Sequence, residues 1–234
     1  MRKYDIILLD ADDTLFDFVQ SEENAIRETF DLYGIPNTTE NLRRYQEINE
    51  DLWRQFERAE ITKSYLLDNR FSLFFSAIGK TGDGVKANSD YLDRLACQHI
   101  LLPGALTLCE NLKALGCRLY LATNGVTRVQ KKRLADSELN GIIDGIFVSE
   151  EAGAQKPQKE YFDYVLSRLK APDRSRVLMV GDSLSSDIKG AVDYGLDSCW
   201  LNRKGASTDL PITAEVHSIP EILRVVEGLS RGFR

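Results

Sequence analysis

The sequence predicts an α/β protein, a doubly wound parallel sheet with helices on both faces, into which a helical segment is inserted. An apolar run, Ile6-Ile7-Leu8-Leu9, lies near the start and predicts a buried strand. Residues 18–99 then show a helical pattern without a strand-like run. From residue 101 onward, strand-like and helical segments alternate, which is typical of a parallel sheet covered on both faces.

The first strand runs directly into an acidic segment. Asp10-Ala11-Asp12-Asp13-Thr14-Leu15 follows the apolar run without a break. A strand that is apolar throughout is typically buried on both faces, so these carboxylates are expected at the end of a buried strand. Such a cluster is electrostatically unfavourable unless a cation or a proton compensates it, and chemistry is the usual reason for its presence.

The helical insert is expected to span residues 17–99, and the sheet domain is expected to comprise residues 1–16 and 100–234. Turns at residues 34–37 and 79–84 separate helices of the insert. Thr38 or Thr39, Thr62 and Ser89 can cap these helices at their N-termini. The expected helices are Ser21–Leu32, Thr39–Glu57, Thr62–Ile78 and Ser89–His99.

The alternating part begins after Leu101-Leu102-Pro103-Gly104. Its expected strands are Arg118–Thr123, Gly145–Val148, Arg176–Val180, Ser198–Leu201 and, near the end, Val216–Ser218. Its expected helices are Val126–Ala135, Lys159–Leu169, Ser186–Tyr194 and Pro220–Gly228. Ligands of such sheets bind beyond the carboxyl ends of the strands, where the strand order reverses. The sequence therefore predicts a site among the polar residues that follow these strands.

Four short motifs occur in one order along the chain. They are Asp10-x-Asp12-x-Thr14, Thr123-Asn124-Gly125, Lys156-Pro157 and Gly181-Asp182-x-x-x-x-Asp187. Each follows an expected strand except Lys156-Pro157, which opens a helix. Together they resemble the motifs of the haloacid dehalogenase-like phosphatase superfamily, and the insert is similar to that superfamily's first-position cap domain. The resemblance covers essentially the whole chain and implies a Rossmann-like core with a helical cap.

The resemblance implies hydrolysis of a phosphomonoester. Asp10 is the candidate nucleophile, a carboxylate that forms an aspartyl-phosphate. Asp12 would protonate the departing alcohol and then deprotonate the attacking water. The hydroxyl of Thr123, with nearby backbone N–H groups, would bind the phosphate, and Asn124 would be a further substrate contact. Lys156 would bind the phosphoryl group and neutralise both that group and Asp10.

Plainer structural interpretations apply to the same residues. Acidic and hydroxyl side chains after a strand often form Asx-turns or helix caps, and a lysine before proline is usually a solvated loop residue. Asp13 fits a structural role best, because the chemistry does not need it. Thr14 is either a turn former or a hydrogen-bond donor behind the site.

A charge count predicts a metal ion. Asp10, Asp12, Asp182 and Asp187 would carry up to four negative charges, to which a phosphate monoester adds more. At an effective dielectric constant of ~20, each like-charge pair at ~4 Å costs about 4 kcal/mol. Carboxylate and water ligands favour magnesium over zinc. We expect Asp10 and Asp182 to be direct ligands together with the main-chain carbonyl of Asp12, whereas Asp187 acts directly or through water.

Two segments, Asp10–Phe18 and Ser149–Pro157, are similar to those of the noncanonical pyrimidine 5′-nucleotidase subfamily. This similarity implies that the substrates are pyrimidine nucleoside monophosphates, such as those of uridine, deoxyuridine or thymidine. The choice of substrate would then reside in the helical cap, which closes over the site and excludes water. Candidate cap residues, for which ordinary helix packing is the alternative, are Trp53, Arg54, Phe56 and Arg70.

Other functions remain compatible with parts of the pattern. A sugar-phosphate phosphatase or a phosphoglucomutase would use the same pair, Asp10 and Asp12. Haloacid dehalogenation is disfavoured, because it needs neither an acid at Asp12 nor a magnesium site. A phospho-accepting signalling receiver is shorter, lacks the insert and carries its acceptor on a middle strand. An inactive nucleotide sensor is a further alternative.

Composition limits the partners. The net charge of −6 argues against a nucleic acid polymer, which requires a basic face. No apolar run approaches the length of a membrane span, and the residues after Met1 do not resemble a signal peptide. The four cysteines lack metal-ligand spacing and are expected to be buried and reduced: Cys97, Cys109, Cys117 and Cys199. We expect a cytoplasmic monomer or homodimer that acts on a small phosphorylated substrate.

Overall fold

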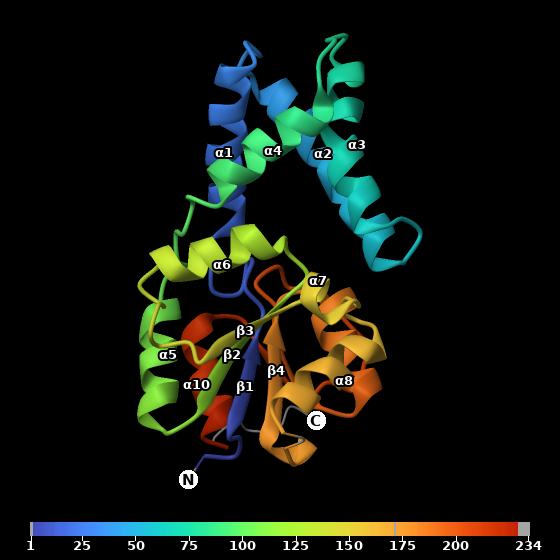
Figure 1. Ribbon diagram of the computed structural model, residues 1–234. Helices are drawn as coiled ribbons and strands as arrows, with labels where there is room; N and C mark the ends of the chain where they lie inside the picture. Colours follow the sequence, from blue (N-terminus) through green and yellow to red (C-terminus); the bar gives the residue numbers. More distant parts are fainter. Residues whose placement is uncertain (1, 171, 229–234) are drawn as a thin grey trace. The chain divides into compact units, whose positions relative to one another are not determined.

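The computed structural model describes residues 2–170 and 172–228, and this part of the chain falls into two compact units (Figure 1). The sheet unit comprises the residues up to Phe18 and those from His99 onward. The helical unit comprises Val19–Gln98. Its bounds differ from the expected insert, residues 17–99, by two residues at one end and one at the other.

The sheet unit contains, within its described residues, a six-stranded sheet in which every neighbouring pair is parallel. The strand order is β3-β2-β1-β4-β5-β6. The strands are β1 (Ile6–Leu9), β2 (Arg118–Thr123), β3 (Gly145–Val148), β4 (Val177–Gly181), β5 (Asp197–Leu201) and β6 (Ala214–Val216). The order reverses between β1 and β4, so the loops after these two strands diverge at the place where parallel sheets bind ligands. The expected doubly wound α/β fold is thereby confirmed.

Helices cover both faces of this sheet because side chains alternate between the faces along each strand. In β1, Ile7 and Leu9 pack with α5 and α10, whereas Ile6 and Leu8 face α8 and α9. Figure 1 shows α5 and α10 on one side and α8 on the other. The helices of the sheet unit are α5 (Ala105–Ala114), α6 (Thr127–Asp136), α7 (Ser149–Ala152), α8 (Lys159–Arg168), α9 (Lys189–Tyr194) and α10 (Ile219–Val226). A 3-10 turn, Arg174–Arg176, precedes β4, and a π turn, Leu184–Ile188, follows it.

The helical unit consists of α1 (Phe18–Leu32), α2 (Thr39–Glu57), α3 (Lys63–Ala77) and α4 (Gly84–Leu95). The hydroxyl of Thr38 accepts a hydrogen bond from the backbone N–H of Asn41, and the hydroxyl of Thr62 caps α3 in the same way. These caps satisfy backbone N–H groups that have no partner within the helix. The core of the unit is a set of packed aromatic rings: Phe30, Tyr45, Phe71, Phe74, Phe75 and Tyr91. None of the helices in the described part of the chain combines the length and apolar character that crossing a bilayer requires.

The last helix of the insert begins earlier than expected. The prediction that Ser89 caps it is wrong, because α4 starts at Gly84 and the carboxylate of Asp83 accepts from the backbone N–H of Lys86. Gly84 does not end a turn here. A Cβ atom at this position would lie 2.2 Å from Oγ of Ser72, so glycine lets the first turn of α4 approach α3 closely.

Other differences from the sequence prediction are local. Helix α5 was not among the expected elements; it begins after Gly104, whose φ of 88° favours glycine. Strand β6 ends at Val216 instead of beginning there. Cys97 is exposed, which corrects the expectation that it is buried, whereas the other three cysteines are buried.

Candidate active site

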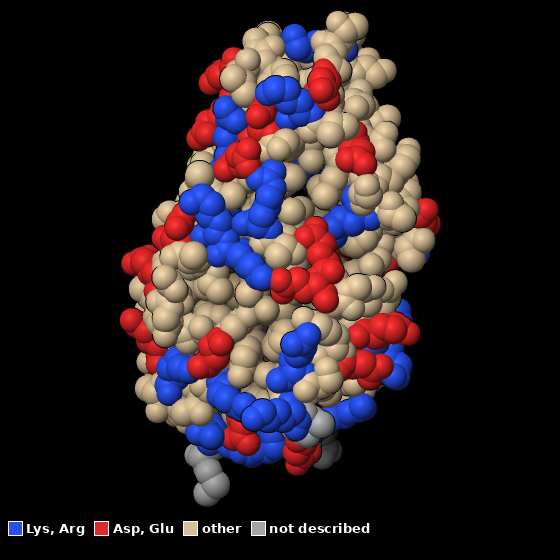
Figure 2. Space-filling view, viewed as in Figure 1, with Lys and Arg blue, Asp and Glu red and all other residues tan. Residues whose placement is uncertain are grey.

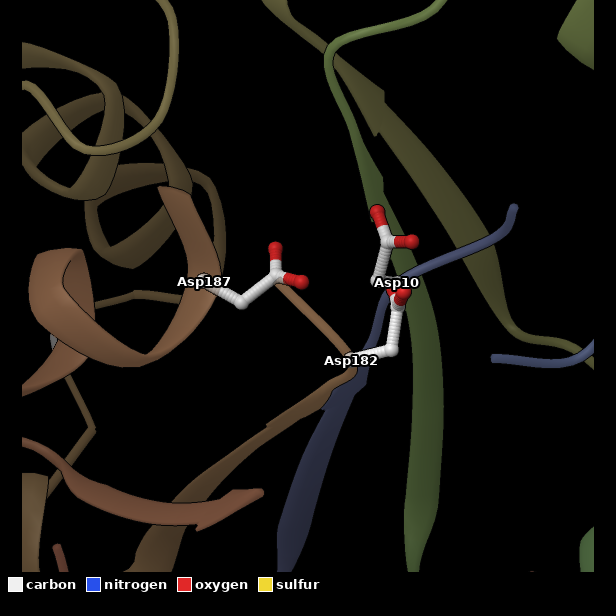
Figure 3. Close-up of side chains that lie close together, drawn as sticks. All are labelled: Asp10, Asp182 and Asp187. Atoms are coloured by element: carbon white, nitrogen blue, oxygen red, sulfur yellow. The ribbon is translucent and has the colours of Figure 1, made fainter. Parts of the chain in front are cut away.

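Three aspartates converge at the carboxyl ends of β1 and β4. Asp10 directly follows β1, Asp182 follows β4, and Asp187 lies on the π turn after β4. One carboxylate oxygen from each lies within 4.8 Å of the others. Figure 3 shows the carboxylate of Asp187 pointing toward those of Asp10 and Asp182. The reversal of strand order thus brings together carboxylates from the first and the last of the four motifs.

Lys156 contacts two of these carboxylates and is almost completely buried, with 1% of its surface exposed. Its Nζ atom donates hydrogen bonds to Oδ1 of Asp10, to Oδ1 of Asp187 and to the backbone carbonyl of Ala122, each at 2.6 Å. An ammonium group has three N–H donors, so these three acceptors use all of them. The lysine is therefore held in one orientation between two acidic residues.

The electrostatics of this cluster follow from burial and crowding. Burial raises the pKa of Asp10, Lys156 opposes that rise, and the charges of Asp187 and Asp182 add to it. The pKa of Asp182 is raised to about 7, by burial first and then by the charge of Asp187. Burial alone would lower the pKa of Lys156, but the charges of Asp10 and Asp187 outweigh burial and raise it. One ammonium group thus compensates the acidic cluster only in part.

The residues that would hold a metal ion fit a hard divalent cation. The cluster of Asp10, Asp182 and Asp187 offers only carboxylate oxygens as ligands. Magnesium prefers such oxygen ligands to the sulfur of a thiolate or the nitrogen of an imidazole. The pKa of Asp182 is raised first by burial and then by the charge of Asp187, so a cation bound here would favour the ionised form of this carboxylate. The cluster does not include the carboxylate of Asp12, whose expected ligand atom is the main-chain carbonyl.

Asp187 is positioned by a hydrogen bond within its own turn and by the space beside Gly181, which has no side chain. Its Oδ2 atom accepts from the backbone N–H of Ser183 at 3.2 Å. A Cβ atom added to Gly181 would lie 2.1 Å from Oδ2 of Asp187. The glycine at the end of β4 therefore makes room for a carboxylate of the cluster. The indole Nε1 of Trp200 donates to the carbonyl of Asp182 at 2.9 Å and fixes the start of this loop.

Thr123 and Asn124, at the end of β2, are joined to the lysine loop. The side-chain amide of Asn124 donates to the carbonyl of Lys156 and accepts from its backbone N–H, both at 2.9 Å. The hydroxyl oxygen of Thr123 accepts from the backbone N–H of Gly125 at 3.0 Å. These bonds fix the lysine loop beside β2, and they give Asn124 a structural function. Direct contact of Thr123 and Asn124 with a substrate stays a prediction.

Asp12 is held by two residues that sequence reasoning missed. Gln130 and Arg133 lie one turn apart on α6. Nε2 of Gln130 donates to Oδ2 of Asp12 at 2.6 Å, and Nη1 of Arg133 donates to its Oδ1. Helix α6 is mostly polar in sequence, which is typical of an exposed helix, so the sequence offered no signal for either contact.

The neighbours of Asp12 have structural contacts. Asp13 adopts a φ of 56°, and its carbonyl accepts from Arg203 at 2.8 Å. The hydroxyl of Thr14 donates to Oδ1 of Asp182 at 3.4 Å, which corresponds to the role of a donor behind the site. Asp13 thus occupies a turn position, in line with the structural interpretation of its sequence.

The candidate specificity residues of the helical unit have different environments. Arg70 is buried, with Nε donating to Asn88 at 2.6 Å and its guanidinium over the ring of Tyr91. Phe56 is buried, and Trp53 packs against it. For Arg70 and Phe56, packing within the unit is the interpretation that these contacts favour.

Charged side chains of both signs are interspersed on the face shown in Figure 2. Several basic residues of the sheet unit pair with acidic neighbours, for example Arg176 with Asp5 and Lys113 with Asp144. The expectation that the protein does not bind a nucleic acid polymer, which follows from the net charge of −6, stays a prediction.

Comparison with known proteins gives consistent results. The family model for haloacid dehalogenase-like hydrolases matches residues 4–195. The chain is 39% identical to the HAD-hydrolase YfnB of Bacillus subtilis over 228 residues, which is 97% of each chain. A crystal structure of YfnB bound to magnesium has a TM-score of 0.90, at 38% identity and with coverage of 96% of this chain and 99% of that one.

Two further relatives are pyrimidine 5′-nucleotidases by name. YjjG of Escherichia coli is 36% identical over 200 residues, covering 86% of this chain and 87% of its own. PynA of Streptococcus pneumoniae is 33% identical over 222 residues, covering 94% of each. The resemblance expected from the four motifs is thereby confirmed, and so is the expectation of an enzyme. The chain belongs to the family of haloacid dehalogenase-like hydrolases.

Proposed function

We propose that this hydrolase is a magnesium-dependent phosphatase that acts through an aspartyl-phosphate on pyrimidine nucleoside 5′-monophosphates. The observation that carries the proposal is the position of Asp10. Asp10 directly follows β1 at the reversal of strand order, and its carboxylate lies 2.6 Å from the ammonium of Lys156 and within the cluster formed with Asp182 and Asp187. A buried carboxylate held beside a fixed cation is suited to attack the phosphorus atom of a phosphoryl group whose oxygens carry negative charge, because the cation lowers the repulsion between the two anions.

In the first step, a carboxylate oxygen of Asp10 forms a bond to phosphorus as the bond from phosphorus to the ester oxygen breaks. The leaving oxygen takes a proton from the carboxyl group of Asp12, and a neutral alcohol departs. In the second step, water attacks the aspartyl-phosphate. Asp12 accepts a proton from that water, the bond from phosphorus to Asp10 breaks, and inorganic phosphate leaves. Asp10 returns as a carboxylate and Asp12 as a carboxylic acid, so the cycle is balanced.

Magnesium, held by Asp10, Asp182 and the main-chain carbonyl of Asp12, with Asp187 directly or through water, would supply positive charge and orient the phosphoryl group. Lys156 donates to Asp10 and Asp187, and its positive charge lowers the repulsion between the nucleophile and the substrate. In this proposal the hydroxyl of Thr123 donates to a phosphoryl oxygen, while Asn124 holds the lysine loop and contacts the substrate.

The substrate class is supported by the relatives. YjjG and PynA, which match most of this chain at 36% and 33% identity, are pyrimidine 5′-nucleotidases. Pyrimidine monophosphates are therefore the first substrates to test.

The test is phosphate release from uridine, deoxyuridine and thymidine monophosphates, from purine monophosphates and from sugar phosphates, with magnesium and with a chelator. We expect magnesium-dependent release with the highest kcat/KM on a pyrimidine monophosphate. A maximum on a sugar phosphate would retain the four-motif site and refute the nucleotide assignment. Equal rates with chelator would refute the magnesium requirement, and binding of nucleotides without any release would indicate a sensor.

A further inference from the structure

We infer that Gln130 and Arg133 are positioning residues, which hold the carboxylate of Asp12 in the orientation needed for proton transfer. The inference rests on the acid–base role of Asp12 in the proposed function. It extends that function to two residues of α6 that belong to none of the four motifs.

The contact engages both oxygens of one carboxylate. Arg133 donates to Oδ1 of Asp12 and Gln130 donates to Oδ2 at 2.6 Å. Arg133 has no exposed surface and Gln130 has 2%, whereas the side chain of Asp12 remains 26% exposed. A carboxylate held by two separate donors cannot rotate about its Cβ–Cγ bond without losing at least one bond. A carboxylate has about four lone-pair sites, and a protonated carboxyl group keeps acceptor sites beside its one O–H donor. The two bonds therefore leave room for the proton that Asp12 gives up in the first step and for the one that it accepts in the second.

The donors are themselves fixed by the loop that carries Asp12. The guanidinium of Arg133 lies over the ring of Phe16, 4.6 Å from its centroid. Phe16 forms a β-bridge with Asp12, and its carbonyl accepts from the backbone N–H of Asp13 at 2.9 Å. The arginine therefore contacts both ends of one short loop. A side chain held in this way is pre-organised, which is a requirement for a group that sets the geometry of another.

Gly125 supplies the space that Gln130 needs. A Cβ atom at Gly125 would lie 2.3 Å from Nε2 and 2.7 Å from Cγ of Gln130. The amide of Gln130 thus passes over the glycine of the second motif to reach Asp12 of the first. This gives a physical reason for a glycine after Thr123-Asn124 that does not depend on a substrate.

The orientation of the Asp12 side chain matters because Asp12 exchanges a proton with two different oxygens in succession. It must reach the ester oxygen in the first step and a water molecule in the second, and proton transfer requires hydrogen-bond distance to each. An Asp12 side chain that turns away loses both steps, while substrate binding at the cluster of Asp10, Asp182 and Asp187 is unaffected. The bonds that Gln130 and Arg133 donate to Asp12 should therefore influence kcat more than KM. We call these two residues the clamp of Asp12.

The first experiment compares Gln130→Met and Arg133→Met with the wild-type protein and with Lys132→Met. Lys132 lies on the same helix, pairs with Asp136 and is about half exposed, so it is a matched control. We expect kcat to fall at least about tenfold in each clamp variant, within the range of general acid–base effects. KM and the magnesium concentration at half-saturation should change less than about twofold. Arg133→Lys should recover part of the loss.

The second experiment places Arg133→Met in an Asp12→Asn background. If Arg133 acts through Asp12, the substitution should change the residual rate less than about twofold there, although it costs tenfold or more in the wild type. Equal losses in both backgrounds, or an unchanged or increased kcat in both Met variants, would overturn the inference. Wild-type turnover by Asp12→Asn itself would refute the acid–base role and the proposed function with it. If the Arg133→Met variant does not fold, Gln130→Met is compared in the same two backgrounds. This substitution removes a neutral side chain, so it leaves no buried charge without a partner.

A crystal structure of the Gln130→Met variant gives a readout that is independent of turnover. We expect the carboxylate of Asp12 to adopt a changed or multiple orientation. An unchanged single orientation would contradict the positioning role.

Discussion

The Nζ atom of Lys156 lies 2.6 Å from Oδ1 of Asp10, although the two residues are 146 positions apart in the sequence. The same nitrogen bonds Asp187 at 2.6 Å, and all three side chains are almost fully buried. One ammonium group thus stabilises the folded sheet unit and prepares the candidate nucleophile. Removing it would leave two buried carboxylates without their cation, which is more damaging than the loss of an exposed ion pair.

Lys156→Met should therefore lower both stability and activity. We expect the free energy of unfolding at pH 8 to fall by roughly 3–5 kcal/mol, the range for a broken buried pair. The loss should be smaller at pH 5, because Asp10 can then be protonated in the folded state. Urea unfolding at the two pH values measures both effects. Lys159→Met, which removes an exposed partner of Asp163, is the control and should change stability by less than about 1 kcal/mol. Equal losses for the two variants would contradict the explanation.

Asp10→Asn should abolish turnover while the protein stays folded. Asparagine keeps the shape of the side chain but cannot form the aspartyl-phosphate, so kcat should fall by about 10⁴-fold or more. Asp13→Asn is a matched control three residues on, because Asp13 has a φ of 56° that asparagine tolerates. It should keep most of the activity. Phosphate release and circular dichroism of both variants test this, and appreciable turnover by Asp10→Asn would exclude the covalent route.

The chemistry-bearing residues could be predicted because they obey a simple rule of position. Asp10, Thr123 and Asp182 each follow an apolar run, and carboxyl ends of parallel strands lie at one edge of the sheet. Two other predictions were wrong. Cys97 was expected to be buried and is exposed, and the last helix of the insert was expected to begin at Ser89 but begins at Gly84. In the latter case a glycine that looks like a turn residue serves close helix packing, which depends on contacts across the fold.

The contacts of Asp12 could not be predicted for a similar reason. The sequence of α6, Thr-Arg-Val-Gln-Lys-Lys-Arg-Leu-Ala-Asp, contains several charged side chains of which Arg133 is buried and Lys132 is not. Which of them is buried depends on where the loop from Asp12 to Phe16 lies. That placement is a tertiary property, and no local pattern specifies it.

Gly181→Ala should weaken the candidate metal site. A Cβ atom would lie 2.1 Å from Oδ2 of Asp187, so either the carboxylate or the π turn must move. We expect the magnesium affinity to fall by about 10- to 100-fold, the range for residues that orient ligands. Isothermal titration with magnesium measures this. Gly181→Ala combined with Asp187→Ala should bind magnesium no more weakly than Asp187→Ala alone. A further loss in the double variant would show that the alanine acts through something other than Asp187.

The acidic cluster should link pH, magnesium and stability. Burial and the charges of Asp187 and Asp13 raise the pKa of Asp182 from 3.8 to about 7. Between these values the folded state binds more protons than the unfolded state, so the stability of the metal-free protein decreases as the pH rises through this window. Above it, the ionised carboxylates bind a cation without first losing a proton. Magnesium should therefore stabilise the protein more at pH 8 than at pH 5.

Urea unfolding at pH 5, 6, 7 and 8, with chelator or with a fixed magnesium concentration, measures this linkage. Asp182→Asn is the matched variant, since it keeps the shape of the side chain and removes its titration. The decline between pH 5 and pH 8 should be shallower in that variant, and the stabilisation by magnesium should largely disappear. A decline as steep as that of the wild type would show that Asp182 does not titrate in this range. Undiminished stabilisation of the variant by magnesium would place the ion elsewhere on the protein.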